Sequence, residues 1–110
     1  MKLVLDTSTP TTKLTLGDQH YVWESGRNLA RDLLAYIHER LKEQGKDWHD
    51  LTEIHYNTGP GSFTGLRIGA TVVNTLATEL NIPLYDQSGK KLTVALPVYD
   101  RPAHTTPPRK

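Results

Sequence analysis

The most informative part of the sequence reads Gly59-Pro60-Gly61-Ser62-Phe63-Thr64-Gly65-Leu66-Arg67-Ile68-Gly69. It stands between a strand candidate, residues 54–58, and a helix candidate that runs to about Leu80. Glycines at such a junction permit tight turns and close packing of the backbone. A hydroxyl group of Ser62 or Thr64 can accept hydrogen bonds from the first free amides of the helix. We therefore expect a strand, a rigid glycine-rich loop and a helix, in that order.

The same loop is an alternative candidate for an anion site, because amides at a helix N-terminus carry partial positive charge. The common phosphate-binding patterns fit it poorly. Gly59 and Gly65 are too far apart for the P-loop pattern, and no lysine follows Gly65. The dinucleotide pattern also fails by one residue, because the spacings of Gly59, Gly61 and Gly65 are two and then four. The sequence favours a packing role for residues 59–65.

The residues that follow predict a parallel crossover unit. Asn81-Ile82-Pro83 interrupts the helical pattern, and Leu84-Tyr85 begins another strand. A strand, a helix and a second strand in this order usually form a right-handed crossover between parallel neighbours. Residues 87–91 are polar and predict a loop, and residues 93–99 predict one more extended piece.

The N-terminal part predicts three short strands. Residues 3–6 are an apolar run that ends at Asp6, and residues 12–16 alternate between polar and apolar side chains. Gly17-Asp18 is a tight-turn pair, and residues 20–23 continue as a third strand. The protein therefore opens with a meander of three strands joined by short turns.

A helix follows the meander, with Asn28 as its expected N-cap and Gly45 as its expected end. Its apolar stripe consists of Leu29, Leu33, Leu34, Ile37 and Leu41. The complete order is βββ-α-β-α-β, an α/β fold with a mixed sheet. By analogy with known folds, this order is typical of a single lobe of the actin, sugar-kinase and Hsp70 superfold, which is ribonuclease H-like.

Length and composition fit one soluble domain. The chain has 110 residues, a hydrophobic fraction of 36% and a net charge of +1. It has no cysteine and no apolar run of membrane-spanning length, so we expect a cytoplasmic protein without contact to a membrane. We expect one lobe over residues 1–100. Residues 101–110 are rich in proline and carry Arg101, Arg109 and Lys110, which predicts a flexible basic tail.

The loop and its surroundings resemble the TsaB (YeaZ) family. The likeness spans residues 1 to about 86 and is specific in residues 59–69. Leu5-Asp6-Thr7-Ser8 is similar to that family's first strand and turn. Residues 97–102 are similar to its C-terminal Pro-x-Tyr-x-Arg ending, which is a short motif.

The resemblance implies a non-catalytic subunit without a cofactor. In the family, TsaB pairs with the catalytic homologue TsaD, and the ATPase TsaE joins them. The assembly transfers a threonylcarbamoyl group to adenosine 37 of tRNAs, so tRNA is expected to be reached only through the complex. TsaB proteins have two lobes and about twice this length, which implies that the second lobe is absent from the middle of the chain and leaves open whether another chain replaces it.

The second helix predicts a partner surface from its residues alone. No charged residue occurs between positions 68 and 78. A half-solvated helix normally carries charges on its wet side, so a helix without them is expected to be covered on both sides. A fully internal helix of a monomer is the alternative. In so small a chain, we favour a partner.

The resemblance agrees, because TsaB-like lobes associate through their first two helices with TsaD or with a second copy. The expected interface residues are Leu33, Leu34, Ile37, Leu41, Arg67, Thr71, Val72, Asn74, Thr75 and Thr78. The signature loop, with an anion site as its alternative role, is Gly59, Pro60, Gly61, Ser62, Phe63, Thr64 and Gly65. A homodimer would occupy the surface that TsaD needs, so the two states should compete.

Other candidate sites are weaker. Asp6 and the turn after it contain no glycine, which favours a capped turn over a phosphate site. The five histidines are dispersed, so we expect neither a metal site nor a catalytic set of side chains. The basic tail is a further candidate for contact with RNA. Two other functions remain open: a small phosphate- or nucleotide-binding enzyme that uses residues 59–65, and a purely homodimeric structural protein.

Overall fold

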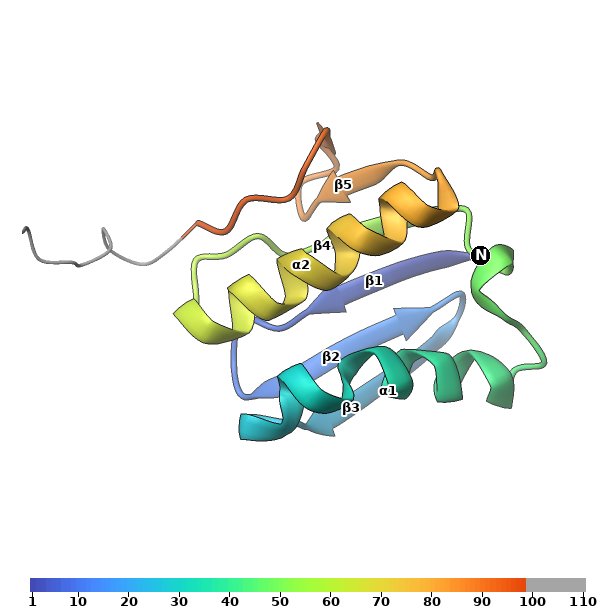
Figure 1. The fold of residues 1–110 in the computed structure, drawn as a ribbon, viewed down its shortest axis with the longest axis horizontal. Coiled ribbons are helices and arrows are strands. Elements are labelled where there is room, and N and C mark those ends of the chain that lie inside the picture. The colour runs from blue at the N-terminus through green and yellow to red at the C-terminus, as the bar shows by residue number, and fades with distance from the viewer. Residues whose placement is uncertain (99–110) are drawn as a thin grey trace, which may run out of the picture.

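The computed structural model of the chain describes residues 1–98, and its first strand lies inside a six-stranded sheet. The strand order is β3-β2-β1-β4-β5-β6 (Figure 1). The strands are β1 (Lys2–Asp6), β2 (Thr11–Leu16), β3 (Gln19–Glu24), β4 (Glu53–Tyr56), β5 (Leu84–Asp86) and β6 (Lys91–Leu92). β1, β2 and β3 are antiparallel neighbours, whereas β4 is parallel to both β1 and β5. The sheet is therefore mixed, as the element order predicts.

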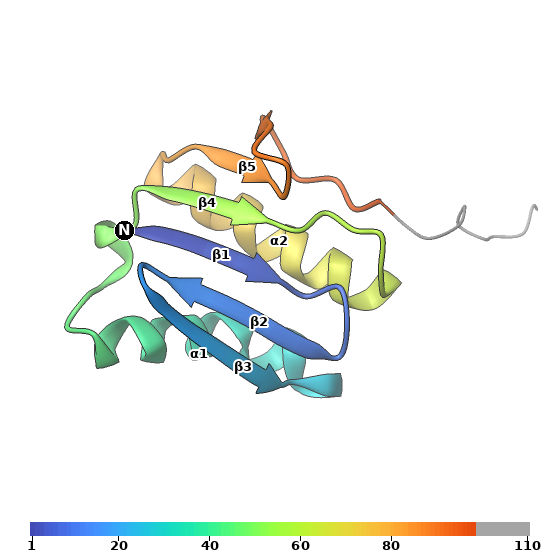
Figure 2. The ribbon, with the colours of Figure 1, turned by 180° about the vertical axis from the view of Figure 1, so that it is seen from behind.

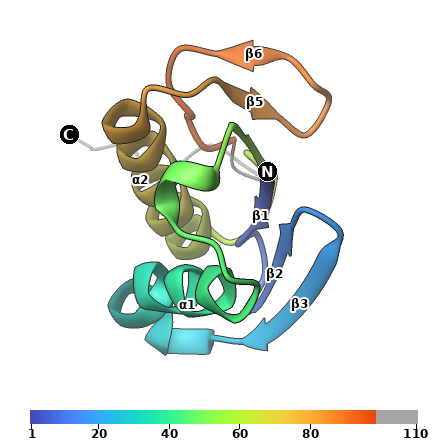
Figure 3. The same ribbon diagram turned by 90° about the vertical axis from the view of Figure 1, so that its right-hand side faces the viewer.

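Two long helices, α1 (Leu29–Glu43) and α2 (Phe63–Leu80), make the crossovers. They lie side by side on one face of the sheet (Figure 3). Single turns of 3₁₀-helix occur at η1 (Gly26–Asn28) and η2 (Trp48–Asp50). The structure is thus a helical layer on a sheet, and one side of each helix remains free to face outward.

The core fills the space between these layers. Leu3 and Leu5 of β1 alternate with half-buried residues, which is the pattern of a strand with one face against the helices. The buried apolar side chains of the other elements include Leu14, Leu16, Leu29, Leu33, Ile37, Leu41, Ile54, Tyr56, Leu66, Val73 and Leu84. Burying one leucine-sized side chain contributes ~1.5–3 kcal/mol, so this cluster fixes how both helices sit on the sheet.

The opposite face of the sheet carries no helix within residues 1–98 (Figure 2). That face carries both polar and apolar side chains, among them the exposed Val22 of β3 and His55, whose ring stacks on Tyr85 with 4.8 Å between centroids. Glu53 lies 3.0 Å from the same imidazole. Within the described part of the chain, no helix is long and apolar enough to cross a membrane.

The helix ends follow local rules. The hydroxyl of Ser62 accepts a hydrogen bond from the Gly65 amide at 3.4 Å, as expected of an N-cap. Gly45 has a φ of 72°, and the Lys46 amide donates to the Leu41 carbonyl at 2.9 Å just beyond the end of α1. The side chain of Asn28 makes no capping hydrogen bond, because this residue closes η1 in a helical conformation.

The predicted order of elements is confirmed from β1 to β5. β6 was not predicted, because it has only two residues and its first, Lys91, belongs to a polar stretch that resembles a loop. No strand forms over residues 93–98, where an extended piece was expected. Tyr99, the boundary near residue 100 and the basic tail 101–110 lie outside the described residues.

Candidate functional site

The glycine-rich loop between β4 and α2 is anchored at its start by side chains from two neighbouring segments. Asn57 Oδ1 accepts a hydrogen bond from the Gly59 amide at 3.0 Å. Gln87, just after β5, accepts from the Thr58 amide at 3.0 Å and donates to the Gly59 carbonyl at 2.9 Å. The Gly59–Pro60 peptide bond is cis. The path of the loop is therefore fixed before α2 begins.

The glycines of the loop are sites of close backbone approach. A Cβ atom on Gly61 would lie 2.6 Å from the carbonyl oxygen of Ser8, which real Cβ atoms do not do. A Cβ on Gly65 would overlap the Thr7 carbonyl, and one on Gly69 would overlap the side-chain oxygens of Thr7 and Tyr56. The turn after β1 therefore packs directly against the start of α2, and only glycine leaves room for it.

Two buried hydroxyl groups hold this contact. The Thr7 hydroxyl donates to the Gly65 carbonyl at 2.7 Å, and the Tyr56 hydroxyl donates to the Leu66 carbonyl at 2.8 Å. The two hydroxyl oxygens lie 3.0 Å apart, so either hydroxyl could instead donate to the other. Because these groups are buried, leaving one unpaired would cost ~1–3 kcal/mol. The bonds lock β1, β4 and the first turn of α2 together.

Asp6 caps the turn beside the loop. Its Oδ1 accepts from the Ser8 amide at 2.9 Å and from the Ser8 hydroxyl at 2.6 Å. Asn57 donates to Oδ2 at 3.2 Å. Burial alone raises the pKa of Asp6, but the hydrogen bonds from Ser8 and Asn57 and the charge of Lys13 outweigh it, so the pKa is lowered. A negative charge therefore stands next to the loop at neutral pH.

These contacts favour packing over anion binding. The amides of Gly59, Ser62 and Gly65 already donate within the chain, to Asn57, to the Ser8 carbonyl and to the Ser62 hydroxyl. A phosphate would have to compete with those acceptors and approach the Asp6 carboxylate. The loop is a rigid joint between the sheet and α2.

The outward side of α2 is a row of polar but uncharged side chains. Thr71, Thr75 and Thr78 are exposed, and Arg67 lies at the N-terminal end of the same side. The Arg67 guanidinium carbon is 5.4 Å from the centroid of the Phe63 ring. Val72 is half-buried against the core. We call Arg67, Thr71, Thr75 and Thr78 the α2 outer face.

Three of the expected interface residues on α1 are not available to a partner. Leu33, Ile37 and Leu41 have exposures of 1%, 0% and 0% and belong to the core between α1 and the sheet. The stripe that was assigned to a partner is the stripe that holds α1 in place. Leu34 is 46% exposed and remains on the outward side. Asn74 is also engaged, because its side chain bonds both backbone groups of Ala95.

A groove of about 500 Å³ runs between the outward sides of the two helices. Its lining consists of Leu34, Ala35, His38, Trp48, Thr75, Leu76, Glu79 and Leu80. Sequence analysis identified only Leu34 and Thr75 as interface residues among these. In the sequence, Trp48 stands out as a large aromatic residue in a polar connection. Its place in the groove cannot be predicted from that, because it depends on the path of η2.

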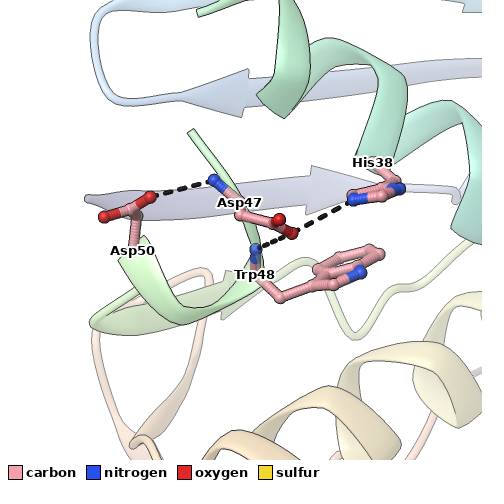
Figure 4. Close-up of polar contacts among 4 residues, drawn as sticks. All are labelled: His38, Asp47, Trp48 and Asp50. Atoms are coloured by element: carbon pink, nitrogen blue, oxygen red, sulfur yellow. Dashed lines mark hydrogen bonds and ion pairs between the residues drawn. The ribbon is translucent and has the colours of Figure 1, made fainter. Parts of the chain in front are cut away.

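Figure 4 shows how the wall of this groove is held. The His38 ring stacks on Trp48 with 5.1 Å between centroids, and its Nε2 lies 3.1 Å from Asp47 Oδ1. The same oxygen accepts from the Trp48 amide at 2.7 Å, and Asp50 accepts from the Asp47 amide at 2.9 Å. Hydrogen bonds from Trp48 and His38 lower the pKa of Asp47. The indole is thereby fixed beside α1.

No group of three or more histidine or acidic side chains within residues 1–98 is placed to hold a metal ion. His38 and His55 each have a carboxylate neighbour, Asp47 and Glu53 respectively, and the two pairs lie on opposite faces of the sheet. Of the described residues that sequence analysis singled out, those of the loop form the joint, and Leu34, Arg67, Thr71, Thr75 and Thr78 lie on the outward side of the helices, whereas Leu33, Ile37 and Leu41 lie in the core.

Comparison with known proteins gives the family. A family model described as TsaD: tRNA N6-adenosine threonylcarbamoyltransferase matches residues 23–89. The tRNA threonylcarbamoyladenosine biosynthesis protein TsaB of Bacillus subtilis (strain 168) is 33% identical over 87 residues, which are 74% of this chain and 38% of that protein. The solved structure of YeaZ from Pseudomonas aeruginosa superposes with a TM-score of 0.64 at 33% identity, over 77% of this chain and 42% of that one.

The chain therefore spans about two fifths of the length of the relatives that it matches. The match to YeaZ confirms the predicted α/β lobe of the actin, sugar-kinase and Hsp70 type. The family model covers more than half of the chain, including the loop and both helices. The residues 59–69, the fold and these relatives agree, and the chain belongs to the TsaB (YeaZ) family.

Proposed function

We propose that the chain is a non-catalytic, cytoplasmic scaffold subunit of the assembly that makes N6-threonylcarbamoyladenosine at position 37 of tRNA. It binds a TsaD-type catalytic subunit through the outward sides of α1 and α2, and a TsaE-type ATPase joins the complex. Contact with tRNA is through the assembly. The names of the matched relatives, which are tRNA threonylcarbamoyladenosine proteins, support the pathway.

The observation that carries the partner proposal is the combination of the α2 outer face with the adjacent groove. The three threonines are exposed and uncharged, so a partner that covers them does not have to desolvate a charge at these positions. Beside them, Leu34 and Trp48 border a groove wide enough for side chains of a partner helix. A surface of this kind suits the docking of a partner helix. Arg67 and Glu79 are the charged residues near the two ends of the outward side of α2.

The loop supports the non-catalytic part of the proposal. The amides of Gly59, Ser62 and Gly65 donate within the chain, and Asp6 places a negative charge beside the loop, which both disfavour a nucleotide phosphate there. We expect no saturable binding when the chain alone is titrated with ATP up to millimolar concentration. Tight, stoichiometric binding would favour the alternative of a small nucleotide-binding enzyme that uses residues 59–65.

Size-exclusion chromatography with light scattering tests the partner proposal. The chain is run alone and mixed with the TsaD homologue from the same source, and a one-to-one complex is expected. Thr75→Arg places a charge in the centre of the α2 outer face and should weaken that complex at least ten-fold. Gln19→Arg adds the same charge at an exposed position of β3 and should leave the affinity unchanged.

The outcomes separate the candidate functions. Equal binding of TsaD by both variants would place the interface elsewhere. A chain that stays monomeric and binds no TsaD would contradict the scaffold proposal. A stable homodimer that TsaD does not dissociate would favour the purely homodimeric structural protein, for which the same exposed face is the supporting observation.

A further inference from the structure

The sheet ends at β6 with an unpaired edge. β6 pairs with β5 on one side and has no strand on the other among the described residues. Beyond it, the backbone groups of Thr93, Val94 and Leu96 form no hydrogen bond with any residue of the described chain. Exposed backbone donors and acceptors of this kind are a template for an added strand. We call β6 together with residues 93–96, which follow it without forming a strand, the β6 edge.

The β6 edge is held in place although it is unpaired. The Ala95 amide donates to Asn74 Oδ1 at 2.7 Å, and the Asn74 amide group donates to the Ala95 carbonyl at 3.1 Å. Further on, the Val98 amide donates to the Thr58 carbonyl at 2.6 Å. A segment that is already ordered loses less conformational entropy when it binds. The hydrogen bonds of Ala95 and Val98 therefore favour binding of a segment to the neighbouring backbone groups of Thr93, Val94 and Leu96.

The two large exposed side chains just beyond β6 are apolar. Val94 and Leu96 are 44% and 68% exposed, and the segment from Leu92 to Val98 contains no charge. A hollow of about 410 Å³ lies between β6 and the C-terminal half of α2. Its lining is mixed: Ala77, Ile82, Pro83, Leu84, Leu92 and Val94 are apolar, whereas Asn74, Thr78, Asn81, Tyr85, Lys91 and Thr93 are polar. A strand added beside β6 would point every second side chain to the face of the sheet that carries α2 and this hollow.

The positive charges near the β6 edge indicate what kind of segment would bind there. Lys91 is the only charged residue that lines the hollow, and Lys90 precedes it. A second copy of the chain would bring two more lysines to the same place, which like-charge repulsion disfavours. The tail 101–110 is basic and lacks acidic residues, so it does not complement Lys91 either. The complement is an acidic segment from another protein.

We infer that the β6 edge binds an extended segment of another protein by strand addition, with apolar side chains at alternate positions and a carboxylate opposite Lys91. The edge is on the flank of α2 that faces away from α1, and the inference does not depend on the proposed TsaD partner. The family match ends at residue 89, just before this edge begins.

Two capped peptides test the inference on the full chain by NMR titration. One reads Thr-Val-Glu-Val-Glu-Val-Thr, and the other has lysine in place of both glutamates. The glutamate peptide is expected to shift the amide signals of Thr93, Val94 and Leu96, to slow their hydrogen exchange, and to bind at least ten-fold more tightly. Lys91→Glu should reverse the preference, whereas Lys46→Glu, at an exposed loop position, should not.

Three results would overturn the inference. The first is no saturable shift with either peptide, and the second is equal binding of both peptides to the unchanged chain. The third is a shift of the same amides with rising concentration of the chain alone, lost in Leu96→Asp but kept in Val22→Asp. That result would make a second copy the occupant, since Val22 is 67% exposed on β3 and matches Leu96 in exposure.

Discussion

At the scale of single residues, glycine is required in and after the loop because neighbouring atoms leave no room for a Cβ atom. Gly61, Gly65 and Gly69 stand where the turn after β1 meets the first turns of α2. Two of the three positions face backbone carbonyls, which cannot move aside as a side chain can. The packing role that the sequence favours over a phosphate site thus agrees with these contacts.

Gly69→Ala should destabilise the chain by ~1–3 kcal/mol through overpacking. Alanine is the better helix former by ~0.5–1 kcal/mol, so the helix itself would gain. The added methyl group nevertheless meets the buried oxygens of Thr7 and Tyr56. Urea denaturation measures the change. Thr78→Ala, on the exposed side of the same helix, should stay within ~0.5 kcal/mol of the unchanged chain. Equal stability of the Gly69 and Thr78 variants would contradict the packing role.

Asp6 should make stability dependent on acid pH. The pKa of Asp6 is lowered in the fold, so its contribution is complete above the unfolded pKa of about 3.9 and is lost as pH falls through the folded value. The chain is therefore expected to unfold more readily at pH 3 than at pH 7, and Asp6→Asn should reduce that difference. Urea denaturation at both values tests it, with Asp18→Asn in an exposed turn as the control. An unchanged difference in Asp6→Asn would show that other groups cause it.

At the scale of elements, the sequence predicts the strands and helices well because each has a clear period. The apolar spacing of Leu29, Leu33, Ile37 and Leu41 identifies α1, but it does not say which neighbour covers the stripe. The sheet covers it here, and this long-range packing has no local signal. β6 escapes prediction for a related reason, since two residues are too few to show alternation.

Asn74 couples α2 to the segment after β6. Asn74→Ala removes both hydrogen bonds to Ala95, so the amide of Ala95 should exchange with solvent at least ten-fold faster. Asn74→Asp keeps the acceptor and should show a smaller effect. Hydrogen exchange followed by NMR measures both. Unchanged protection in Asn74→Ala would mean that the Val98 contact alone orders the segment.

At the scale of the whole molecule, the layer arrangement decides which surfaces are free. Both helices cover the same face of the sheet, so their outward sides form one continuous surface with the groove between them. The sequence predicts an uncharged side of α2, whereas the groove requires the relative position of α1, α2 and η2. Trp48 and His38 enter the candidate site only through that arrangement.

If TsaD and a second copy both use this surface, the two associations must compete. Leu34→Glu puts a charge at the rim of the groove, where desolvation makes it costly, and should weaken self-association and TsaD binding in parallel, each at least ten-fold. Val22→Glu, which alters a more exposed apolar residue on β3, should weaken neither. Light scattering with and without TsaD measures both equilibria. If Leu34→Glu abolished only one of them, the two partners would occupy separate surfaces, and added TsaD would leave the homodimer intact.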